Sequence, residues 1–367
     1  MFITQLNKQP KRVTQQDVAR AAGVHRSSVC LAMQNHPNIP VATRERIQEI
    51  ARKLGYQPDP MLSALAVYRR QQSPRVFQGT LAWLGNTLPH YDWRKIPIFQ
   101  QNYEGAVACA QSHGYTVEVF DLQTPDISPQ RMAGILRSRN ITGIFVAPQP
   151  KPYATLDFPW EHFSAVTFGF TLLQPLLHCV AATQYRATLQ TMQRMRGLGY
   201  KRIAFASSLL QDERVDHNCL AAYLAEMAIH GEKPLLTPLK PGWTTPENLS
   251  AWMREVRPEA AVISLDVRDM LIEAGFRFPR DVAIACPMMF EPNGPLAGVC
   301  ENSRLVGEAS ADFLVAMIQR GERGVPPVPQ RLLIEGTWVE GTTLPPLRPA
   351  PAAKRKTAAR SGKSRKV

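Results

Sequence analysis

The sequence predicts an α/β fold in which a small helical domain precedes a two-lobed body of parallel sheets. About the first 60 residues show three short helical patterns, separated by breaks that contain glycine and proline. From about residue 76, short β-rich apolar runs alternate with segments of helix length, which is typical of parallel α/β sheets. This alternation continues for about 270 residues, which is enough chain for two lobes.

The charge of the chain is concentrated at its two ends. The 367 residues carry a formal net charge of +13. Residues 1–70 hold 11 Lys/Arg and 4 Asp/Glu, residues 346–367 hold 8 Lys/Arg and no acid, and the body between them has a net charge of −2. A near-neutral body with two basic ends indicates a protein that binds a polyanion. The alternative is a basic surface that is only solvated and binds nothing. It explains the pattern less well, because the charges of such a surface would be scattered along the chain rather than concentrated at its two ends.

Several classes of protein are disfavoured by composition and motif. No run approaches about 20 apolar residues, and "MFITQLNKQPKR" lacks the apolar core of a signal peptide. The six cysteines are scattered and form no C-x-x-C pair, which predicts reduced, structural cysteines. We find no metal-ligand spacing, P-loop, G-x-S-x-G or H-E-x-x-H, so we expect no metal, no cofactor and no enzyme. A DNA-tethered hydrolase or dehydrogenase is the minor alternative.

The helical domain is predicted to contain three helices. Thr14 followed by Asp17 indicates a capped start, and Gly23 ends the first helix. The second helix is expected over about 26–34, and the third over about 41–54, before Gly55. The residues predicted to face inward are Val18, Ala19, Ala21 and Ala22; Val29, Ala32 and Met33; and Ile47, Ile50, Ala51 and Leu54.

The first two of these helices, joined at Gly23, form a helix-turn-helix. The second helix of such a motif enters the DNA major groove, and its N-terminal side chains contact base edges. Arg26 can donate two hydrogen bonds to a guanine edge, and the small Ser27 and Ser28 allow the helix to approach closely. The alternative is an ordinary three-helix bundle with a glycine turn, which the α/β body and the basic balance disfavour.

Seven apolar runs predict strands of the body. In chain order they are "FQGTLAWLG", "YTVEVFDL", "ITGIFVAP", "FSAVTFGF", "KRIAFASS", "AAVISLD" and "DVAIACPMM". The final "LPPLRPAPAAKRKTAARSGKSRKV" is rich in Pro, Ala, Lys and Arg and is predicted to be disordered.

Two long stretches of the N-terminal region resemble the lactose-repressor/galactose-repressor (LacI/GalR) family of bacterial transcription regulators. "VTQQDVARAAGVHRSSV" is similar to its helix-turn-helix, and "TRERIQEIARKLGYQPDP" to its third helix and hinge entry. Weaker resemblance to its periplasmic-binding-protein-like core lies in "GYTVEVFDL", "RNITGIFVAP", "GYKRIAFAS", "GFRFPRDVAIA" and "IEGTWVEGTT". The resemblance implies a DNA-binding headpiece at 1–58, a hinge helix and linker at 59–75, an effector-binding and dimerisation core at 76–345, and a disordered basic tail at 346–367.

The resemblance also implies which residues contact DNA. The base-reading positions are His25, Arg26, Ser27 and Leu31. The phosphate-contacting positions are Thr14, Gln15, Ser28, Asn38, Thr43 and Arg44. The family usually has serine at position 25, where histidine caps the helix less well, and often arginine at 31, where leucine makes only apolar contacts. We therefore expect a base preference different from that of the best-known members.

"DPMLSALAVYRR" matches the family's hinge helix, which folds on DNA and enters the minor groove. Leu65 falls at the position of the leucine that wedges into the central base step, and Arg69 and Arg70 suit phosphates. The alternative is a permanent interdomain helix packed on the core.

Family cores bind a small molecule between their lobes, but three polar anchors are absent here. Cys219 replaces an arginine, Pro287 an aspartate and Leu265 an asparagine, whereas Asp266 remains. The ligand is then more apolar, or other anchors serve, or no ligand binds. The candidate effector-binding residues follow the first strand of the core or lie near other strand ends. They are Tyr91, Trp93, Arg94, Trp160, Arg214, Asp216, Asn218, Trp243 and Asp266, with His90 and His217 as further possibilities.

The expected function is a sequence-specific regulator, most simply a repressor, that binds double-stranded operator DNA and is gated by an unidentified small-molecule effector in the interlobe cleft. We expect it in a bacterial cytoplasm, at the nucleoid, without a membrane partner. A homodimer is expected because the Pro/Ala/Lys-rich tail cannot form the apolar heptad helix of tetrameric members, and two-fold symmetry implies a palindromic site. The basic tail either adds salt-sensitive DNA affinity or only solubilises the chain. The alternative function is an architectural DNA-binding protein whose core only dimerises and binds no effector.

Overall fold

A computed structural model describes residues 13–33, 39–56, 77–292 and 294–347. The expected hinge helix, and with it Leu65, Arg69 and Arg70, lies outside the described residues, as do Asn38 and most of the basic tail. Among the described residues, no helix is long and apolar enough to cross a membrane.

Three helices form the headpiece, as predicted: α1 (Gln15–Ala22), α2 (Arg26–Met33) and α3 (Val41–Lys53). Thr14 and Asp17 form a reciprocal capping box at the start of α1, and Gly23 ends it with φ 63°. The small core consists of Val18, Ala19, Ala22, Val29, Ala32, Ile47 and Ala51. Two predicted inward residues are wrong: Ala21 is exposed because an eight-residue helix turns only one face to so small a core, and Leu54 is 40% exposed because it is the cap beyond α3.

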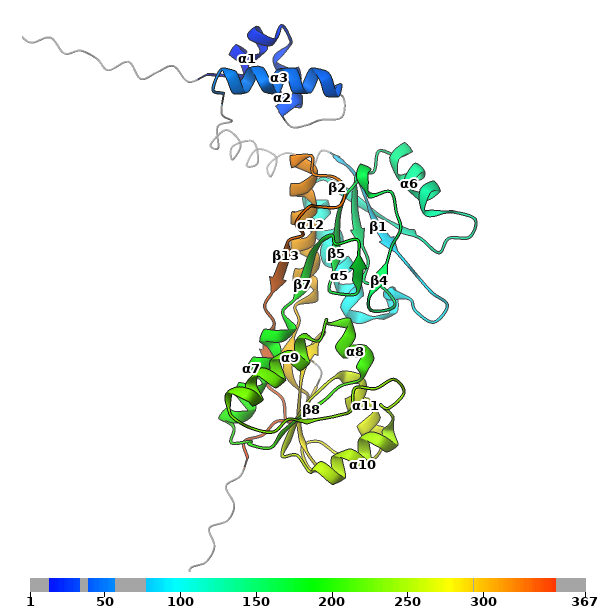
Figure 1. Ribbon diagram of the computed structural model, residues 1–367, viewed down its shortest axis with the longest axis vertical. Coiled ribbons are helices and arrows are strands. Elements are labelled where there is room, and N and C mark those ends of the chain that lie inside the picture. The colour runs from blue at the N-terminus through cyan, green and yellow to red at the C-terminus, as the bar shows by residue number, and fades with distance from the viewer. Residues whose placement is uncertain (1–12, 34–38, 57–76, 293, 348–367) are drawn as a thin grey trace, which may run out of the picture.

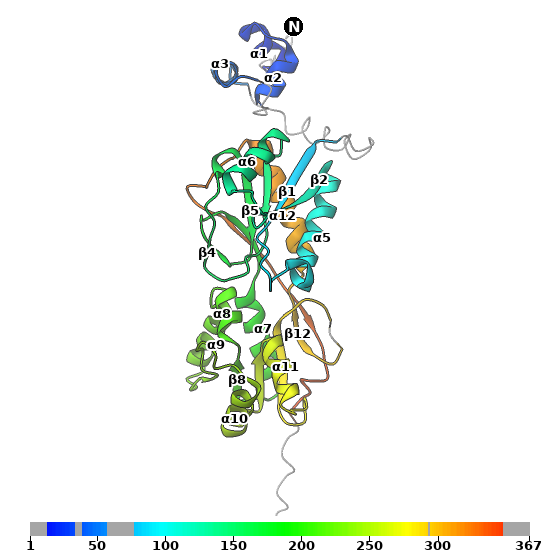
Figure 2. The same cartoon turned by 90° about the vertical axis from the view of Figure 1, so that its right-hand side faces the viewer.

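The N-terminal lobe (N-lobe) is a parallel sheet with strand order β13-β7-β5-β3-β1-β2. Helices α5 and α12 cover one face, and α6 covers the other (Figures 1 and 2). The elements are β1 (Gly79–Gly85), β2 (Tyr115–Asp121), β3 (Gly143–Val146), β5 (Ser164–Phe168), β7 (His178–Ala182), β13 (Arg331–Ile334), α5 (Pro97–Ser112), α6 (Pro129–Ser138) and α12 (Ser303–Arg320). A two-stranded sheet, β4 (Ala154–Thr155) with β6 (Leu172–Gln174), and the 3-10 turns η1 (Trp93–Lys95) and η2 (Trp160–His162) complete it.

The C-terminal lobe (C-lobe) repeats this design with strand order β14-β12-β11-β10-β8-β9, in which only β14 runs antiparallel to its neighbour. Helices α7 and α9 pack on one face, and α10 and α11 on the other. The elements are β8 (Ile203–Ala206), β9 (Leu235–Leu236), β10 (Ala260–Ile263), β11 (Ala283–Met289), β12 (Ala297–Cys300), β14 (Thr337–Val339), α7 (Gln184–Gly197), α8 (Leu209–Arg214), α9 (Asn218–Ile229), α10 (Pro246–Val256) and α11 (Leu265–Glu273).

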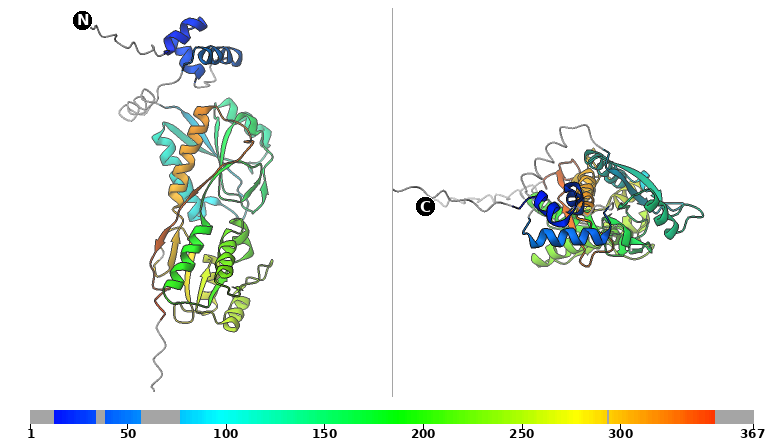
Figure 3. Two further views of the ribbon diagram at one scale, coloured as in Figure 1. Left: turned by 60° about the vertical axis from the view of Figure 1, so that its left-hand side comes forward. Right: turned by 90° about the horizontal axis from the view of Figure 1, so that it is seen from above.

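The two lobes are joined by three crossings of the described chain, which Figure 3 shows side by side between them. The chain passes from β7 to α7, returns from β12 to α12, and leaves again from β13 to β14. Each of the seven predicted runs contains a strand, so the two-lobed parallel α/β fold is confirmed. Contacts with the C-lobe continue past residue 345, since the Leu347 amide donates to the Leu198 carbonyl at 2.9 Å.

Candidate functional site

The start of α2 presents an exposed polar edge made by His25, Arg26 and Ser27. The Nδ1 atom of His25 accepts from the Ser27 amide at 3.3 Å and contacts the Ser27 hydroxyl at 2.8 Å. The imidazole therefore does what a serine cap does at this end, by binding a free amide of the first turn. Sequence reasoning expected a weaker cap here. The His25 ring is engaged with Ser27 of its own helix, so the exposed Arg26 is the side chain of this edge that is best placed to contact a base.

The remaining predicted DNA positions differ in exposure. Thr14 is exposed, but the Asp17 carboxylate binds its hydroxyl at 2.7 Å and its amide at 2.9 Å. Five predicted positions are half-buried around the headpiece core: Gln15, Ser28, Leu31, Thr43 and Arg44. Their contacts with DNA stay predictions.

A pocket of about 300 Å³ lies between the two lobes. The N-lobe contributes apolar side chains from the start of α5 and the loop after β5, and the C-lobe contributes residues from α8, α11 and the end of β11. The main apolar lining residues are Ile96, Phe99, Phe168, Phe170, Val215, Leu265, Met288 and Phe290. A pocket with this lining favours a ligand with a large apolar surface.

Arg214 reaches across this pocket from the C-lobe to the N-lobe. Its Nη1 donates to the carbonyl oxygens of Gln149 at 3.1 Å and Pro150 at 3.0 Å. Its guanidinium lies over the rings of Phe99 at 5.4 Å and Tyr91 at 5.9 Å, a cation–π geometry. Its Nη2 is buried and makes no hydrogen bond within the described part of the chain. A buried, unpaired guanidinium nitrogen at a pocket wall is a donor suited to an anionic or carbonyl group.

Two acidic side chains also line the pocket. Asp266 Oδ1 is buried and has no hydrogen-bond partner among the described residues. Glu301 is buried where β12 leads into α12, and Gln184 Nε2 donates to it at 2.8 Å. Burial raises the pKa of Glu301 to about 7, against the smaller opposing effect of Gln184. Near neutral pH, this carboxyl group can therefore donate as well as accept a hydrogen bond.

Two further contacts join the lobes beside the pocket. The Tyr153 hydroxyl of the N-lobe lies 3.0 Å from His217 Nε2 of the C-lobe, and His217 Nδ1 lies 2.5 Å from Asp212. Burial raises the pKa of Asp212, while its hydrogen bond with His217 acts in the opposite direction. In addition, Asp216 pairs with Arg331 of β13 at 4.0 Å. These two contacts and the Arg214 hydrogen bonds connect the lobes through side chains, in addition to the three chain crossings.

The predicted effector residues fall into three groups. Arg214 and Asp266 line the pocket, and Tyr91 lies directly behind Arg214, where its hydroxyl donates to Pro148 at 2.8 Å. Three candidates lie on the surface or beside the pocket, and each already makes a polar contact within the protein. Arg94 binds Asp92, Asp216 pairs with Arg331, and Asn218 donates to the Val215 carbonyl.

The third group, the three predicted tryptophans, does not line the pocket. Trp93 is 2% exposed and packs with Trp83 and Tyr103, at 5.2 Å from each, in the N-lobe core. Trp160 is 5% exposed in the opposite core of that lobe, and Trp243 packs on the C-lobe core. The reason is that large aromatic side chains gain more from packing against the sheet than from lining an open cleft.

Sequence reasoning missed the aromatic and acidic lining at Phe99, Phe170, Phe290 and Glu301. For the three phenylalanines a signal was present, since Phe99 lies at the start of α5, and Phe170 and Phe290 follow strands at the lobe boundary.

The matches to known proteins fit this architecture. Residues 14–59 match the family model described as "Bacterial regulatory proteins, lacI family". The chain is 24% identical over 224 residues to "HTH-type transcriptional regulator PtxS" of Pseudomonas plecoglossicida, which covers 61% of this chain and 62% of that protein. It is 25% identical over 146 residues to "HTH-type transcriptional repressor CytR" of Escherichia coli (strain K12), which covers 40% and 39%. The chain thus matches less than two thirds of the length of either relative.

Solved structures share the fold over most of the chain. A "transcriptional regulator CelR-cellobiose complex" has a TM-score of 0.52 and 20% identity, covering 90% of this chain and 100% of that one. The "lac repressor dimer bound to operator and the anti-inducer ONPF" has a TM-score of 0.51 and 17% identity, covering 91% and 100%. The helix-turn-helix of this chain thus matches the lacI family of bacterial regulatory proteins over residues 14–59, and its two-lobed core shares the fold of solved regulators of this kind.

Proposed function

We propose that the protein is a sequence-specific DNA-binding transcriptional repressor that binds a palindromic operator as a homodimer. The observation that carries this proposal is the capped, exposed start of α2, where His25, Arg26 and Ser27 stand free of the headpiece core. Base-edge contacts from this end of the second helix are how helix-turn-helix proteins read sequence. The Lys and Arg residues of the basic headpiece supply the affinity for DNA phosphates that accompanies base recognition.

A selection of bound sequences from random duplex DNA tests this proposal. We use the full-length protein at near-physiological salt and expect a palindromic sequence, preferred about 10³-fold or more over bulk DNA. Enrichment of no sequence, with binding that collapses as salt rises, contradicts the proposal and supports the architectural alternative.

We further propose that a small ligand in the interlobe pocket controls DNA binding. The pocket is apolar over most of its lining, and it is also lined by Arg214 and Asp266, whose Nη2 and Oδ1 atoms have no hydrogen-bond partner among the described residues. A ligand with an aromatic or aliphatic body, one anionic or carbonyl acceptor and one donor satisfies both groups. The loss of three polar anchors at Cys219, Leu265 and Pro287 points in the same direction.

Differential scanning fluorimetry and operator binding separate the possible ligands. We compare aromatic carboxylic acids with neutral sugars of the same size, and we expect the acids to raise the melting temperature and to change operator affinity. If only the sugars do so, the assignment of an apolar acidic ligand is wrong. If neither class acts and operator binding is tight, the core serves dimerisation alone.

A further inference from the structure

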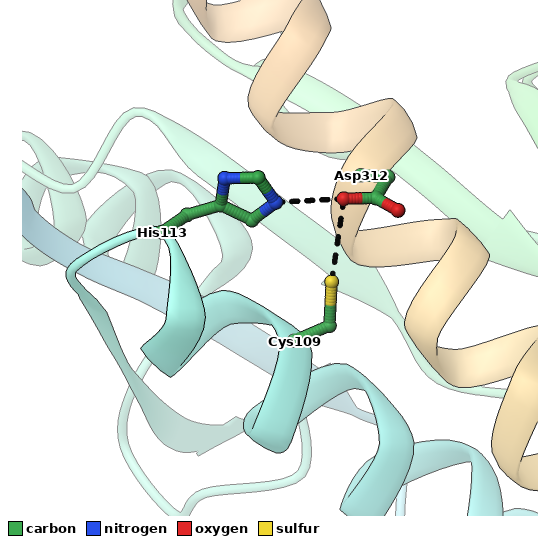
Figure 4. A group of neighbouring side chains, drawn as sticks. All are labelled: Cys109, His113 and Asp312. Atoms are coloured by element: carbon green, nitrogen blue, oxygen red, sulfur yellow. Dashed lines mark hydrogen bonds and ion pairs between the residues drawn. The ribbon is translucent and has the colours of Figure 1, made fainter. Parts of the chain in front are cut away.

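A cluster of metal-ligating side chains lies on α5 and α12, outside the interlobe pocket. It contains Cys109 from the last turn of α5, His113 from its cap, and Asp312 from the middle of α12. Asp312 Oδ1 lies 2.6 Å from His113 Nε2 and 3.4 Å from Cys109 Sγ. Figure 4 shows the imidazole and the thiol pointing from one helix toward the carboxylate of the other. One potential ligand atom from each residue lies within 4.8 Å of the others.

The backbone holds these three positions rigidly because α5 and α12 touch at two glycines. A Cβ atom on Gly105 would lie 2.0 Å from the Arg304 carbonyl oxygen, and one on Gly307 would lie 2.1 Å from the Asn102 carbonyl oxygen. Cys109 follows Gly105 by one helical turn, and Asp312 follows Gly307 by little more than one. Cys109 and His113 are four residues apart, so they share one face of α5. The site is therefore preorganised by packing that does not involve its own side chains.

The donor set selects the class of metal. A thiolate, an imidazole and a carboxylate together suit Zn²⁺ and similar borderline transition metals, whereas Mg²⁺ and Ca²⁺ prefer oxygen ligands alone. Tetrahedral Zn²⁺ with its usual bond lengths places its ligand atoms about 3.3–3.8 Å apart. The sulfur–oxygen distance of 3.4 Å already fits, and the nitrogen–oxygen distance of 2.6 Å needs only a small rotation of exposed side chains.

A nucleophilic triad is the obvious rival, and the geometry argues against it. In such a triad the imidazole stands between the nucleophile and the acid. Here the carboxylate stands in the middle, and it accepts from both the imidazole and the thiol.

We propose that Cys109, His113 and Asp312 form a binding site for one Zn²⁺-like divalent ion, which clamps α5 to α12. Binding replaces the thiol proton by the metal: the S–H bond breaks, an S–metal bond forms, and the proton is released to solvent. His113 binds through its neutral ring, and the carboxylate keeps its charge. Water completes the coordination, because His113 and Asp312 are exposed at this surface.

Metal titration of the full-length, tag-free, reduced protein tests this proposal. We expect one Zn²⁺ per chain in competition with a chromophoric chelator, and little competition from Mg²⁺. Co²⁺ in place of Zn²⁺ is expected to give the absorption of a thiolate-to-cobalt charge-transfer transition. Zn²⁺ is also expected to raise the melting temperature, because a ligand that binds only the folded state stabilises it.

Three variants remove one ligand each: Cys109→Ser, His113→Gln and Asp312→Asn. Each is expected to raise the Zn²⁺ dissociation constant by at least about tenfold, since even residues that merely support a metal ligand change affinity by about 10–100-fold. Cys109→Ser is also expected to abolish the charge-transfer band. The matched controls are Cys30→Ser, a cysteine of the headpiece, and His230→Ala, whose imidazole lies 3.1 Å from Glu226.

The exposed positions of His113 and Asp312 allow these two substitutions without opening the core, and circular dichroism checks the fold of every variant. Absence of stoichiometric binding overturns the proposal. So does binding that is unchanged in the folded ligand variants, or binding that Mg²⁺ displaces as well as Co²⁺ does.

Discussion

The guanidinium of Arg214 is hydrogen-bonded to the backbone carbonyl of Gln149, with Nη1 3.1 Å from the oxygen, although the two residues belong to different lobes. A side chain of α8 therefore ties the C-lobe to the loop that follows β3 of the N-lobe. The same side chain forms one wall of the pocket and keeps Nη2 unpaired there. A ligand that binds Nη2 would be sensed by the residue that joins the lobes, which is the coupling that a gated regulator requires.

Replacing Arg214 is expected to loosen the two lobes. Arg214→Gln removes charge-assisted hydrogen bonds to two carbonyls, each worth about 1.5–3 kcal/mol when formed by a charged group. We expect a larger radius of gyration of the ligand-free protein in small-angle X-ray scattering, and weaker binding of acidic ligands. Arg94→Gln is the matched control, because Arg94 is half-exposed and bonded to Asp92 outside the pocket. Equal scattering curves for Arg214→Gln and the unchanged protein would contradict the bridging role.

The buried Glu301 is expected to make stability depend on pH. Its pKa is raised to about 7 in the folded protein from 4.5, so between these values the native state binds the proton more often than the unfolded state. The stabilisation is complete below about pH 4.5 and is lost as pH rises through about 7. The full effect is on the order of 3 kcal/mol, at about 1.36 kcal/mol per pKa unit.

Denaturant unfolding at several pH values measures this effect. Glu301→Gln is expected to flatten the pH profile between about 5 and 8, because the amide cannot ionise in the pocket. Glu335→Gln, at an exposed glutamate, serves as the control and is expected to leave the profile unchanged. A Glu301→Gln profile as steep as that of the unchanged protein would show that this carboxyl group does not carry the pH dependence.

Arg26 is expected to read one base pair in each operator half. Arg26→Ala should cost roughly 1–3 kcal/mol on the preferred operator and relax the preference at one symmetric position. Binding to a set of operators changed at single positions measures this loss. Arg20→Ala removes an exposed arginine of α1 that lies near Asp17, and it is expected to leave the base preference intact. Equal weakening on all DNA by Arg26→Ala would assign Arg26 to the phosphates instead.

The contact of α5 with α12 is expected to tolerate no side chain at its two glycines. Gly105→Ala places a methyl group against the Arg304 backbone, and Gly307→Ala places one against the Asn102 backbone, so the helices must separate. Overpacking of this kind typically costs about 1–3 kcal/mol.

Equilibrium unfolding measures the cost, with Gly134→Ala as the control. Gly134 lies within α6, and among the described residues no atom outside its own stretch of helix lies within 4 Å of its would-be Cβ. Alanine there is expected to stabilise by about 0.4–1 kcal/mol, because it restricts the unfolded chain. If Gly105→Ala leaves the free energy of unfolding unchanged or raises it, as expected for Gly134→Ala, the two helices can move apart without cost.

Local patterns predicted the architecture well. Thr14 and Asp17, three residues apart, correctly predicted the capped start of α1, and Gly23 correctly predicted its end. The seven apolar runs each contained a strand. Most of these strands are buried on both faces and are therefore apolar along their length, whereas the edge strand β2 is only half-buried. The short returning strands β13 and β14 carry mixed sequences at sheet edges and lie outside these seven runs.

Local patterns predicted the pocket less well. An aromatic residue near a strand end has the same local signature in a core as in a cleft, and Trp93 and Trp160 were assigned to the cleft for this reason. Glu301 was missed because one buried carboxyl group beside a strand has no pattern of its own. Its burial depends on α12, α7 and the crossings that surround it.

The sequence by itself determined the helix-turn-helix, the alternation of strands and helices, and the uneven charge of this protein. Each of these depends on residues that are near neighbours in the chain or on simple counts. Only the tertiary structure decided which side chains meet across the lobes and between α5 and α12. Arg214 is 65 residues from Gln149, and Asp312 is 199 residues from His113. Such pairs arise from the packing of whole elements, whose relative placement no local periodicity specifies.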